Sequence, residues 1–409
     1  MTAGDFLERL LDGVAVEWVA LGDVAKYSDV RIDCTGIDER NYVGVDNLLQ
    51  NGAGKAESTY VPSEGRLIEY RPGDVLIGNI RPYLKKIWLA DQSGGTNGDV
   101  LVVRSIHEAL NPGYLYQLLT DESFFDYNMQ HAKGAKMPRG DKARILEYKI
   151  PIPCPSNPSR SLEIQAEIVR VLGAFTELID ELNVELAARK KQYNYYRDRL
   201  LNFDEGEAEW KTLGDVALIQ RGASPRPISK FITEDETGVP WIKIGDTTPG
   251  SKYVNGTAQK ITQEGARSSR VLDKGDFILS NSMSFGRPYI LGISGAIHDG
   301  WASISKFSNV LSSHFLYHYL SSSSVKSYWA GKINSGSVSN LNADIIKALP
   351  VPVPSLAQQN RIAALLDKFD ALTNSVAEGL PREIELRKKQ YSYYRNLLLS
   401  FPKSDEVKA

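Results

Sequence analysis

The chain has 409 residues, of which 42% are hydrophobic and 24% charged, and its formal net charge is −2. This composition is typical of an ordinary soluble globular protein, and the length allows two to four domains. The two cysteines, Cys34 and Cys154, exclude a disulfide framework and favour the reducing cytoplasm. The sequence lacks a signal-peptide pattern and an apolar run long enough to cross a membrane. Near-neutral charge does not indicate a nucleic-acid binder, so any basic surface must be local or completed by partner chains.

Two motifs each occur twice. W-V-A-L-G-D-V-A begins at Trp18 and W-K-T-L-G-D-V-A at Trp210, an offset of 192 residues. R-K-K-Q-Y-N-Y-Y-R ends at Arg197 and R-K-K-Q-Y-S-Y-Y-R at Arg395, an offset of 198. A duplication of this length predicts two copies of one domain, each followed by the same connector, with approximate two-fold symmetry.

The globular segments, about 18–155 and about 210–353, have the patterns of small mixed α/β domains. We expect strands at 74–80, 99–103, 241–244 and 276–280, and helices at 112–126 and 313–329. Both copies carry a Gly-Asp turn before an apolar strand, an Arg-Pro-Tyr motif at 81–83 and 287–289, and an exit of alternating prolines. Elsewhere the copies diverge, which favours one fold with two different targets.

Basic and polar loops recur at matched places in the two copies. Glycines in these loops permit close approach of the backbone, and the side chains suit phosphates or base edges, although ordinary solvated loops remain the alternative. The candidates in the first copy are Arg31, Arg81, Lys85, Lys133, Lys136, Arg139 and Lys142. Those in the second copy are Arg221, Arg226, Lys230, Arg287, Lys332, Asn334 and Asn340.

The connectors have apolar residues at alternating spacings of four and three, which predicts long coiled-coil helices. The first seam runs without interruption from Ile168 to Phe203. The second contains a four-residue insertion near Gly379 and Pro381, where we expect a stutter and a kink. Since neither helix can bury its seam alone, we expect an antiparallel pair, with packing of each helix on its own domain as the alternative. The predicted divisions are 1–155, 156–203, 204–353 and 354–409.

A search for catalytic motifs finds no convincing active site. Residues 51–55 and 245–250 resemble phosphate loops only in part and are better interpreted as turns. His314 and His318 are four residues apart, but no cysteine or third histidine lies nearby to complete a zinc site. The sequence therefore favours a non-catalytic chain with no metal or cofactor of its own.

The W-x-x-L-G-D-V-A openings, the proline exits, G-L-P-R-E-I-E-L-R-K-K-Q-Y-S-Y-Y-R and the closing L-L-L-S-F-P-K resemble specificity subunits of Type I restriction–modification systems. The resemblance covers essentially the whole chain. It implies an α+β, pseudo-two-fold protein with two globular α/β target recognition domains separated by two long antiparallel coiled-coil helices. The first connector departs from the pattern because it lacks G-L-P-R-E.

The resemblance also implies partners and roles. Each domain is expected to read half of a bipartite, asymmetric site on double-stranded DNA, while the helices set the spacer and dock two modification subunits, which restriction subunits then join. S-adenosylmethionine would belong to the modification subunits, and ATP and Mg to the restriction subunits. Tyr195, Arg197, Tyr393 and Arg395 are candidates for docking. The alternatives are a specificity subunit of a fused system that cuts on both sides of its site, or a structural adaptor that does not bind DNA.

Overall fold

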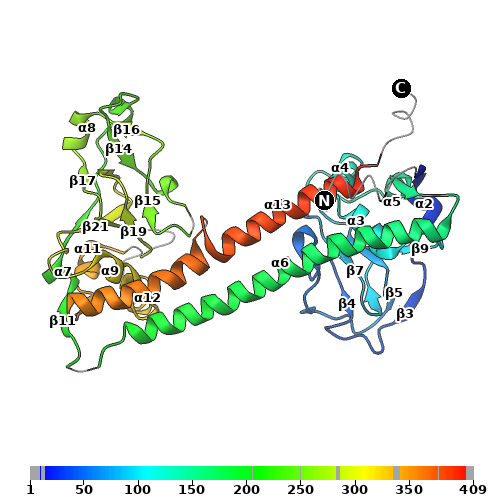
Figure 1. Ribbon diagram of the computed structural model, residues 1–409, viewed down its shortest axis with the longest axis horizontal. Helices are drawn as coiled ribbons and strands as arrows, with labels where there is room; N and C mark the ends of the chain where they lie inside the picture. The colour runs from blue at the N-terminus through cyan, green and yellow to red at the C-terminus, as the bar shows by residue number, and fades with distance from the viewer. Residues whose placement is uncertain are drawn as a thin grey trace. The chain divides into compact units, whose positions relative to one another are not determined.

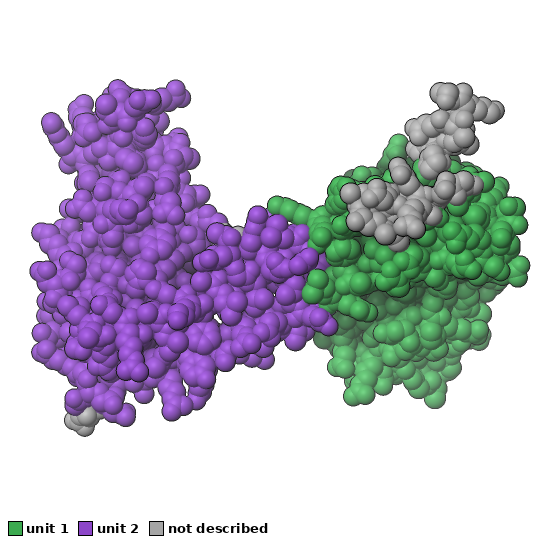
Figure 2. All heavy atoms as spheres, in the orientation of Figure 1, with its two compact units in different colours: residues 1–178, 388–409 green, residues 179–387 purple. Residues whose placement is uncertain are grey.

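The structure, a computed structural model, describes residue 10 and residues 14–204, 206–248, 250–281, 286–334, 341–375 and 377–401. The chain forms two compact units (Figure 2). Unit 1 comprises residues 1–178 and 388–409, and unit 2 comprises residues 179–387. Each unit contains one sheet-rich domain and parts of the connector helices (Figure 1).

The first connector is a single helix, α6 (Pro158–Leu200), of 43 residues. At 1.5 Å per residue its length is about 65 Å. The seam predicted from Ile168 onwards is therefore helical nearly to its end, with Leu201 and Phe203 following the last turn. This confirms the predicted long helix between two sheet-rich domains.

The second connector is divided into α12 (Leu356–Asn374) and α13 (Gly379–Leu399). A single kinked helix was the wrong expectation here, because the four inserted residues separate two helices. Gly379 has φ +76°, a conformation that glycine adopts without strain, and it opens α13. Pro381 lies in the first turn of α13, where a missing backbone N–H breaks no helical hydrogen bond.

Unit 1 contains two four-stranded sheets. The first has the order β2 (Ala25–Tyr27), β9 (Val100–Ser105), β6 (Val75–Gly78), β7 (Ile87–Leu89). The second has the order β3 (Arg31–Asp33), β5 (Arg66–Tyr70), β8 (Gly94–Thr96), β4 (Tyr42–Val43). The helices are α2 (Leu21–Val24), α3 (Pro112–Leu119), α4 (Glu122–Gln130) and α5 (Lys142–Glu147).

Alternation along the strands divides the core of unit 1 into two layers. Val75 and Ile77 of β6 are buried against the helices, whereas Leu76 between them is buried against residues of the second sheet such as Tyr70. The first sheet is therefore covered on both faces, which explains why its strands are continuous apolar runs.

Unit 2 repeats this arrangement with two five-stranded sheets. The first has the order β12 (Leu218–Arg221), β21 (Trp301–Ser305), β18 (Phe277–Ser280), β19 (Pro288–Leu291), β15 (Tyr253–Val254). The second has the order β13 (Ile232–Thr233), β16 (Lys260–Ile261), β14 (Val239–Ile242), β20 (Gly295–Ile297), β17 (Arg270–Leu272). The helices are α7 (Leu213–Val216), α8 (Gln263–Arg267), α9 (Ser313–Leu320), α10 (Ser323–Asn334) and α11 (Ala343–Lys347).

The repeated opening and exit motifs pair with each other in both units. β1 (Val16–Ala20) is antiparallel to β10 (Lys149–Pro153), and β11 (Glu209–Thr212) is antiparallel to β22 (Pro350–Val353). Each pair forms a sheet of only two strands, where a proline lacking an N–H is tolerated. The two ends of each domain are thereby joined at the start of a connector helix.

Two helix predictions need correction. Residues 112–126 and 313–329 each contain two helices, not one. In unit 1 the side chain of Asp121 accepts a hydrogen bond from the backbone N–H of Ser123 and caps a new helix. In unit 2 the hydroxyl of Ser322 similarly accepts a hydrogen bond from the N–H of Val325. The apolar periodicity continues across the break, which is why it suggested one helix.

The two Arg-Pro-Tyr motifs are not structurally equivalent. In β6–β7, Ile77 pairs with Ile87, whereas in β18–β19 Leu279 pairs with Pro288. Since Ile77 and Leu279 stand four residues after the glycine of the shared Gly-Asp turn, Pro288 corresponds to Ile87 and not to Pro82. Pro82 instead begins a short 3-10 turn ahead of β7 (Pro82–Leu84). The Gly-Asp turn is truly shared, with Gly73 at φ +88° and Gly275 at φ +97°.

Connector helices pair within each unit. In unit 1 the ring of Phe175 stacks on Tyr394 at 5.2 Å between centroids, and in unit 2 Phe369 stacks on Tyr196 at 5.6 Å. Each unit thus joins an early part of one connector to a late part of the other, as expected for antiparallel partners. The alternative is also partly correct, since Ile168 and Leu172 belong to the core of unit 1.

Candidate nucleic-acid interface and docking surfaces

The basic loop of unit 1, residues 131–144, folds back on itself and onto the end of β6. Lys133 and Arg139 exchange two backbone hydrogen bonds of 2.8 Å, and the N–H of Arg81 donates to the carbonyl of Pro138 at 2.7 Å. These bonds bring Arg81 into the same surface as Lys133, Lys136 and Arg139, all of which are exposed. The predicted grouping of basic residues around this loop is therefore present in the fold.

Carboxylates hold several of these cations in place. Lys133 forms an ion pair of 2.6 Å with Asp141, and a nitrogen of Arg139 lies 3.1 Å from Asp99. Asp141 also caps α5, whose first residue is Lys142. Ion pairs and backbone hydrogen bonds within the loop therefore orient Lys133 and Arg139.

The remaining candidates of unit 1 lie elsewhere. Arg31 is exposed at the start of β3 in the second sheet, where it pairs with Ile68 of β5. Lys85 forms an ion pair with Glu122 at the start of α4. The sequence does not reveal this difference, because both side chains occupy turn-rich segments.

In unit 2 the basic residues are spread over several elements. Arg221 donates a 3.2 Å hydrogen bond to the carbonyl of Asp299, and Arg226 lies 3.5 Å from the carboxylate of the same residue. Lys230 ends a short 3-10 turn and is exposed. Arg287 immediately precedes β19.

The polar stretch 332–340 in unit 2 is not the simple counterpart of loop 131–144. Lys332 is exposed in the last turn of α10, so its backbone is helical. Asn334 ends that helix, and its side chain lies outside the described part of the structure, as does all of Asn340. The helix extends past 329 to Asn334 although Gly331 lowers its helix propensity.

Both units place an aspartate–arginine pair at the same turn of the fold. The strand registers make the β8–β9 turn (97–99) and the β20–β21 turn (298–300) equivalent. Asp99 meets Arg139 from the loop after α4, whereas Asp299 meets Arg226 from the loop after β12. The loops that carry Arg139 and Arg226 therefore contact the same turn of the fold in their respective units, but they come from different parts of the domain. Neither aspartate stood out in the sequence.

The repeated Tyr and Arg of the connectors anchor the helices to the domains. In unit 1 the hydroxyl of Tyr391 donates to Gln117 at 3.1 Å, and Arg395 donates to the carbonyl of Gln117 at 2.8 Å. Arg395 also lies 3.3 Å from Asp121. In unit 2 the hydroxyl of Tyr193 lies 3.0 Å from Nδ1 of His318, the residue equivalent to Gln117.

This anchoring changes the interpretation of the docking candidates. Arg197 and Arg395 are only 5% and 8% exposed, and both contact the domain of their own unit. They are therefore unavailable to a partner subunit in this conformation, although Arg197 also lines a cavity of unit 2. Tyr195 and Tyr393, at 58% and 62% exposed, remain accessible. The difference arises because residues two positions apart in a helix are rotated by about 200° and face nearly opposite sides, which a shared motif does not reveal.

A second anchor on each connector was missed in the sequence. The buried amide of Gln165 accepts a hydrogen bond from the N–H of Asn111 and donates to the carbonyl of Ala109. Gln359 makes the same two bonds to Ser312 and Val310. The spacing of 194 residues between these glutamines equals that between Phe175 and Phe369. Aligning the two connectors with this offset would therefore have identified the glutamines as a repeated pair.

A groove recurs in both units where the two repeated motifs meet. Its volume is about 280 Å³ in unit 1 and about 510 Å³ in unit 2. The unit 1 groove is lined by residues including Trp18, Leu118, Ser123, Tyr148, Asn396 and Leu399. The equivalent residues line the unit 2 groove, namely Trp210, Tyr319, Ser324, Leu349, Asp198 and Leu201. Trp210 is 46% exposed, which is unusual for so large an apolar side chain.

His314 and His318, the two histidines considered as possible zinc ligands, both contact Asp367. His318 Nε2 lies 2.7 Å from Asp367, while His314 and Lys252 contact the same carboxylate. Burial opposes charge on Asp367, but hydrogen bonds from His318, Lys252 and His314 outweigh it and lower its pKa. Within the described residues, no group of three or more His, Cys, Asp or Glu side chains is arranged to hold a metal.

Among the helices that the structure describes, none is long and apolar enough to cross a membrane.

Solved structures share this fold. The chain resembles a protein from a structure of a type I R-M system, with a TM-score of 0.58, 21% identity, and coverage of 94% of this chain and 95% of the other. It also resembles the S subunit of a type I restriction–modification system from M. genitalium, with a TM-score of 0.57, 14% identity, and coverage of 96% and 97%. The fold class is thus that of type I S subunits.

Sequence comparisons give the family. A family described as "Type I restriction modification DNA specificity domain" matches residues 206–386. The EcoR124I/EcoR124II specificity subunit of Escherichia coli is 35% identical over 100% of both chains. A putative type I specificity subunit of Haemophilus influenzae is 32% identical over 97% of this chain and 98% of its own. The chain therefore belongs to the family of type I restriction enzyme specificity subunits.

Proposed function

We propose that this chain is a non-catalytic DNA-reading subunit in which each unit recognises one half of a bipartite, asymmetric DNA site. The observation that carries the proposal is the matched turn of the two units, where Asp99 and Asp299 hold arginines from different loops. A shared scaffold with different reading loops suits a site whose halves differ in sequence. Arginine is the side chain best suited to guanine in the major groove, and a carboxylate beside it limits its orientations.

The remaining candidates have supporting roles in this proposal. Exposed and half-buried cations on the domain surfaces suit phosphate contacts, which fix orientation without reading sequence. In unit 1 these are Arg31, Arg81, Lys85, Lys133, Lys136 and Lys142, and in unit 2 they are Arg221, Lys230, Arg287 and Lys332. Because the chain has a net charge of −2, partner subunits must provide much of the phosphate neutralisation.

The twin grooves are the proposed docking sites for two modification subunits. Two equivalent grooves formed by repeated residues match two copies of one partner, and the exposed Trp210 provides an aromatic anchor. Exposed Tyr195 and Tyr393 lie on the connector helices, three residues before the groove residues Asp198 and Asn396. S-adenosylmethionine would be bound by those subunits, and ATP and Mg by restriction subunits in the cytoplasmic complex.

Methylome sequencing of a host that expresses the chain with its modification subunits tests the proposal. We expect one asymmetric, split motif, and a gel shift of that duplex that strengthens when modification subunits are added. Arg139→Ala should relax one half of the motif, and Arg226→Ala the other. A chain that shifts no duplex in either form would favour an adaptor that does not bind DNA.

A separate insertion tests whether the helices set the spacer. Four residues added near Glu181 lengthen α6 by about 6 Å. At 3.4 Å per base pair along the duplex, the unread spacer should change by about one or two base pairs. An unchanged spacer in the methylome would contradict the role of the helices as a ruler, without affecting the proposed half-site recognition.

A further inference from the structure

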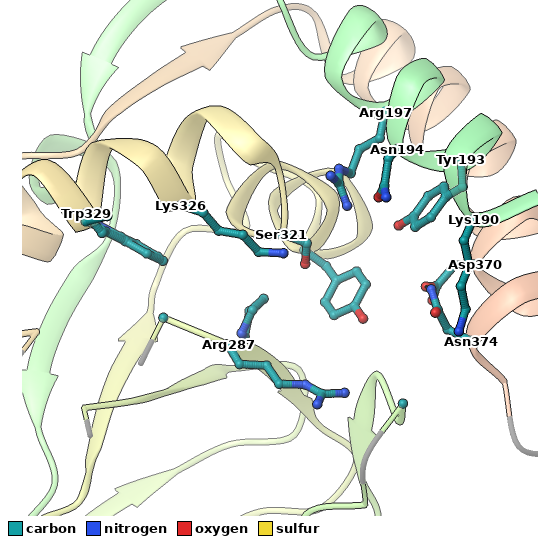
Figure 3. Close-up of a pocket in the computed structure, with 15 residues that line it drawn as sticks. Lys190, Tyr193, Asn194, Arg197, Arg287, Ser321, Lys326, Trp329, Asp370 and Asn374 are labelled. Atoms are coloured by element: carbon teal, nitrogen blue, oxygen red, sulfur yellow. The ribbon is translucent and has the colours of Figure 1, made fainter. Parts of the chain in front are cut away.

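Unit 2 contains a cavity of about 650 Å³ between its connector helices and its domain (Figure 3). Its walls come from the end of α6, the start of β19, the α9–α10 junction and the end of α12. The volume is within the range of small-molecule sites in proteins. Every residue that lines it belongs to unit 2.

Cations dominate this cavity. Arg197, Arg287 and Lys326 project into it from three different elements, as Figure 3 shows, and Lys190 lies on the wall formed by α6. The one acidic residue of the lining is Asp370, whose carboxylate accepts a 2.9 Å hydrogen bond from Asn374. Arg197 is paired with Asp198 at 3.1 Å. In the part of the chain that the structure describes, no ion pair neutralises Lys190, Arg287 or Lys326.

The cations are close enough to repel one another. Burial, followed by the charge of Arg197, lowers the pKa of Lys326; the charge of Asp198 opposes this shift, and Arg287 adds to it. Arg287 lies over the ring of Tyr289, at 5.2 Å from its centroid, and Arg197 lies over Tyr193 at 5.4 Å. The aromatic rings hold the guanidinium groups, and within the described residues only that of Arg197 also has a carboxylate partner, Asp198, so like charges remain grouped around an open space.

Unit 1 has no such arrangement at the equivalent positions. The alignment of α4 with α10 places Phe125 at the position of Lys326 and Asn128 at that of Trp329. Phe125 is 2% exposed and part of the core. Lys86, which takes the place of Arg287, donates a 2.5 Å hydrogen bond to the carbonyl of Val45. The cation cluster is therefore a specialisation of unit 2.

We infer that this cavity binds a phosphate group through Arg287, Lys326 and Arg197. Guanidinium and ammonium groups converging from separate elements are the donors that proteins use for phosphate. A docking role for an identical partner is less suitable, because that role would need the site in both units. The phosphate can come from a free phosphate compound or from the backbone of bound DNA, and the latter source rests on the proposed function.

Pyrophosphate titration of the full chain, followed by calorimetry, tests the free source. Lys326→Gln and Arg287→Gln should each weaken binding by at least about tenfold, the usual loss when one charge-assisted contact is removed. The matched control is Lys274→Gln, which removes an exposed charge from the β17–β18 turn of the same unit. It should leave pyrophosphate binding unchanged.

The second arm measures the salt dependence of duplex binding by the chain together with its modification subunits. If the phosphate belongs to DNA, Lys326→Gln should reduce the slope of log affinity against log salt by about 0.9, while Lys274→Gln should not. A change in either arm supports the site and identifies the source. Two results together overturn the inference. In the first, the wild-type chain does not bind pyrophosphate, or binds it no more tightly than Lys326→Gln and Arg287→Gln do. In the second, the salt slope of Lys326→Gln equals that of Lys274→Gln. Failure of the wild-type complex to bind any duplex would instead refute the proposed function, and the pyrophosphate arm would then decide alone.

Discussion

The two units use the same anchor with different partners. In unit 1 Tyr391 and Arg395 hold the connector on Gln117 and Asp121, while in unit 2 Tyr193 contacts His318 and Arg197 contacts Asp198 and Ser323. The helix motif is nearly identical in the two copies, so the difference lies in the domains. Duplication thus preserved the attachment of the helices, while the surrounding residues diverged into a closed core in unit 1 and a basic cavity in unit 2.

The largest expected effect comes from removing the second half of a connector pair. A fragment of residues 1–203 lacks Leu398 and Phe401, which are 2% and 6% exposed in the core of unit 1. Each such side chain contributes about 2 kcal/mol when buried, so the bared surface should drive self-association. Sedimentation should detect a dimer, since residues 193–203 repeat the motif that covers this surface.

The fragment also tests whether the anchor specifies the association. Arg197→Ala should weaken the dimer, because Arg197 would occupy the place of Arg395 on a second copy. Tyr195→Ala, at an exposed neighbouring position, is the control. A stable, monomeric fragment would contradict the idea that the helices depend on each other for burial.

The next effect compares the two anchors directly in the full chain. Arg395→Ala should destabilise unit 1 by about 3 kcal/mol, because it removes two hydrogen bonds and an ion pair from a buried position. Arg197→Ala should cost less, since its bond to Ser323 is 3.4 Å long. Hydrogen exchange measured peptide by peptide gives the loss of stability in each unit separately. Equal losses in both units would show that the anchors are energetically alike.

A third prediction separates the reading loops. Asp99→Asn should reduce discrimination at one half-site by about tenfold, because a neutral amide holds Arg139 less firmly. Asp299→Asn should affect the other half through Arg226, and by less, since that pair is longer at 3.5 Å. Methylation of duplex libraries randomised in one half at a time provides the measurement. Loss at both halves from either variant would indicate a general folding defect.

Much of the architecture follows from sequence periodicity. The seam from Ile168 to Phe203 predicted α6, and the shared turns at Gly73 and Gly275 marked equivalent strands. The break before Gly379 was expected only as a kink, because a heptad count registers an insertion but not the backbone conformation that accommodates it. Helix ends at Thr120 and Ser321 were missed for the related reason that local caps can interrupt a continuing apolar pattern.

The candidate site was less predictable than the fold. Loop 131–144 was identified because five cations lie close together in sequence. The cavity of unit 2 collects Lys190, Arg287 and Lys326 from positions up to 136 residues apart, so no local pattern indicates it. Lys326 stands out only when it is compared with Phe125, the buried residue at the equivalent position of unit 1. That equivalence is known only from the strand and helix registers of both units.

The smallest expected effect concerns pH and again contrasts the units. Burial and the charge of Lys252 lower the pKa of His318, although the bond to Asp367 opposes them, so folding favours the neutral form of this imidazole. When the chain unfolds, His318 regains its ordinary pKa near 6.5 and takes up a proton at lower pH. The stability of unit 2 is therefore fully present above about pH 6.5 and declines as the pH falls below it, with a slope of at most about 1.4 kcal/mol per pH unit for one proton.

His318→Gln installs the residue that unit 1 has at this position and should flatten that slope in denaturant titrations between pH 7 and pH 5. His298, whose pKa is also lowered mainly by burial, is present in both the wild-type chain and His318→Gln. Its contribution therefore cancels when the two slopes are subtracted. The variant Gln117→His, made in unit 1, is the reciprocal test. It should introduce a pH dependence of the same sign, because Gly173 replaces Asp367 there and no equivalent carboxylate opposes the effect of burial on the pKa of the imidazole. A wild-type slope that persists in His318→Gln would assign the pH dependence of unit 2 to other groups.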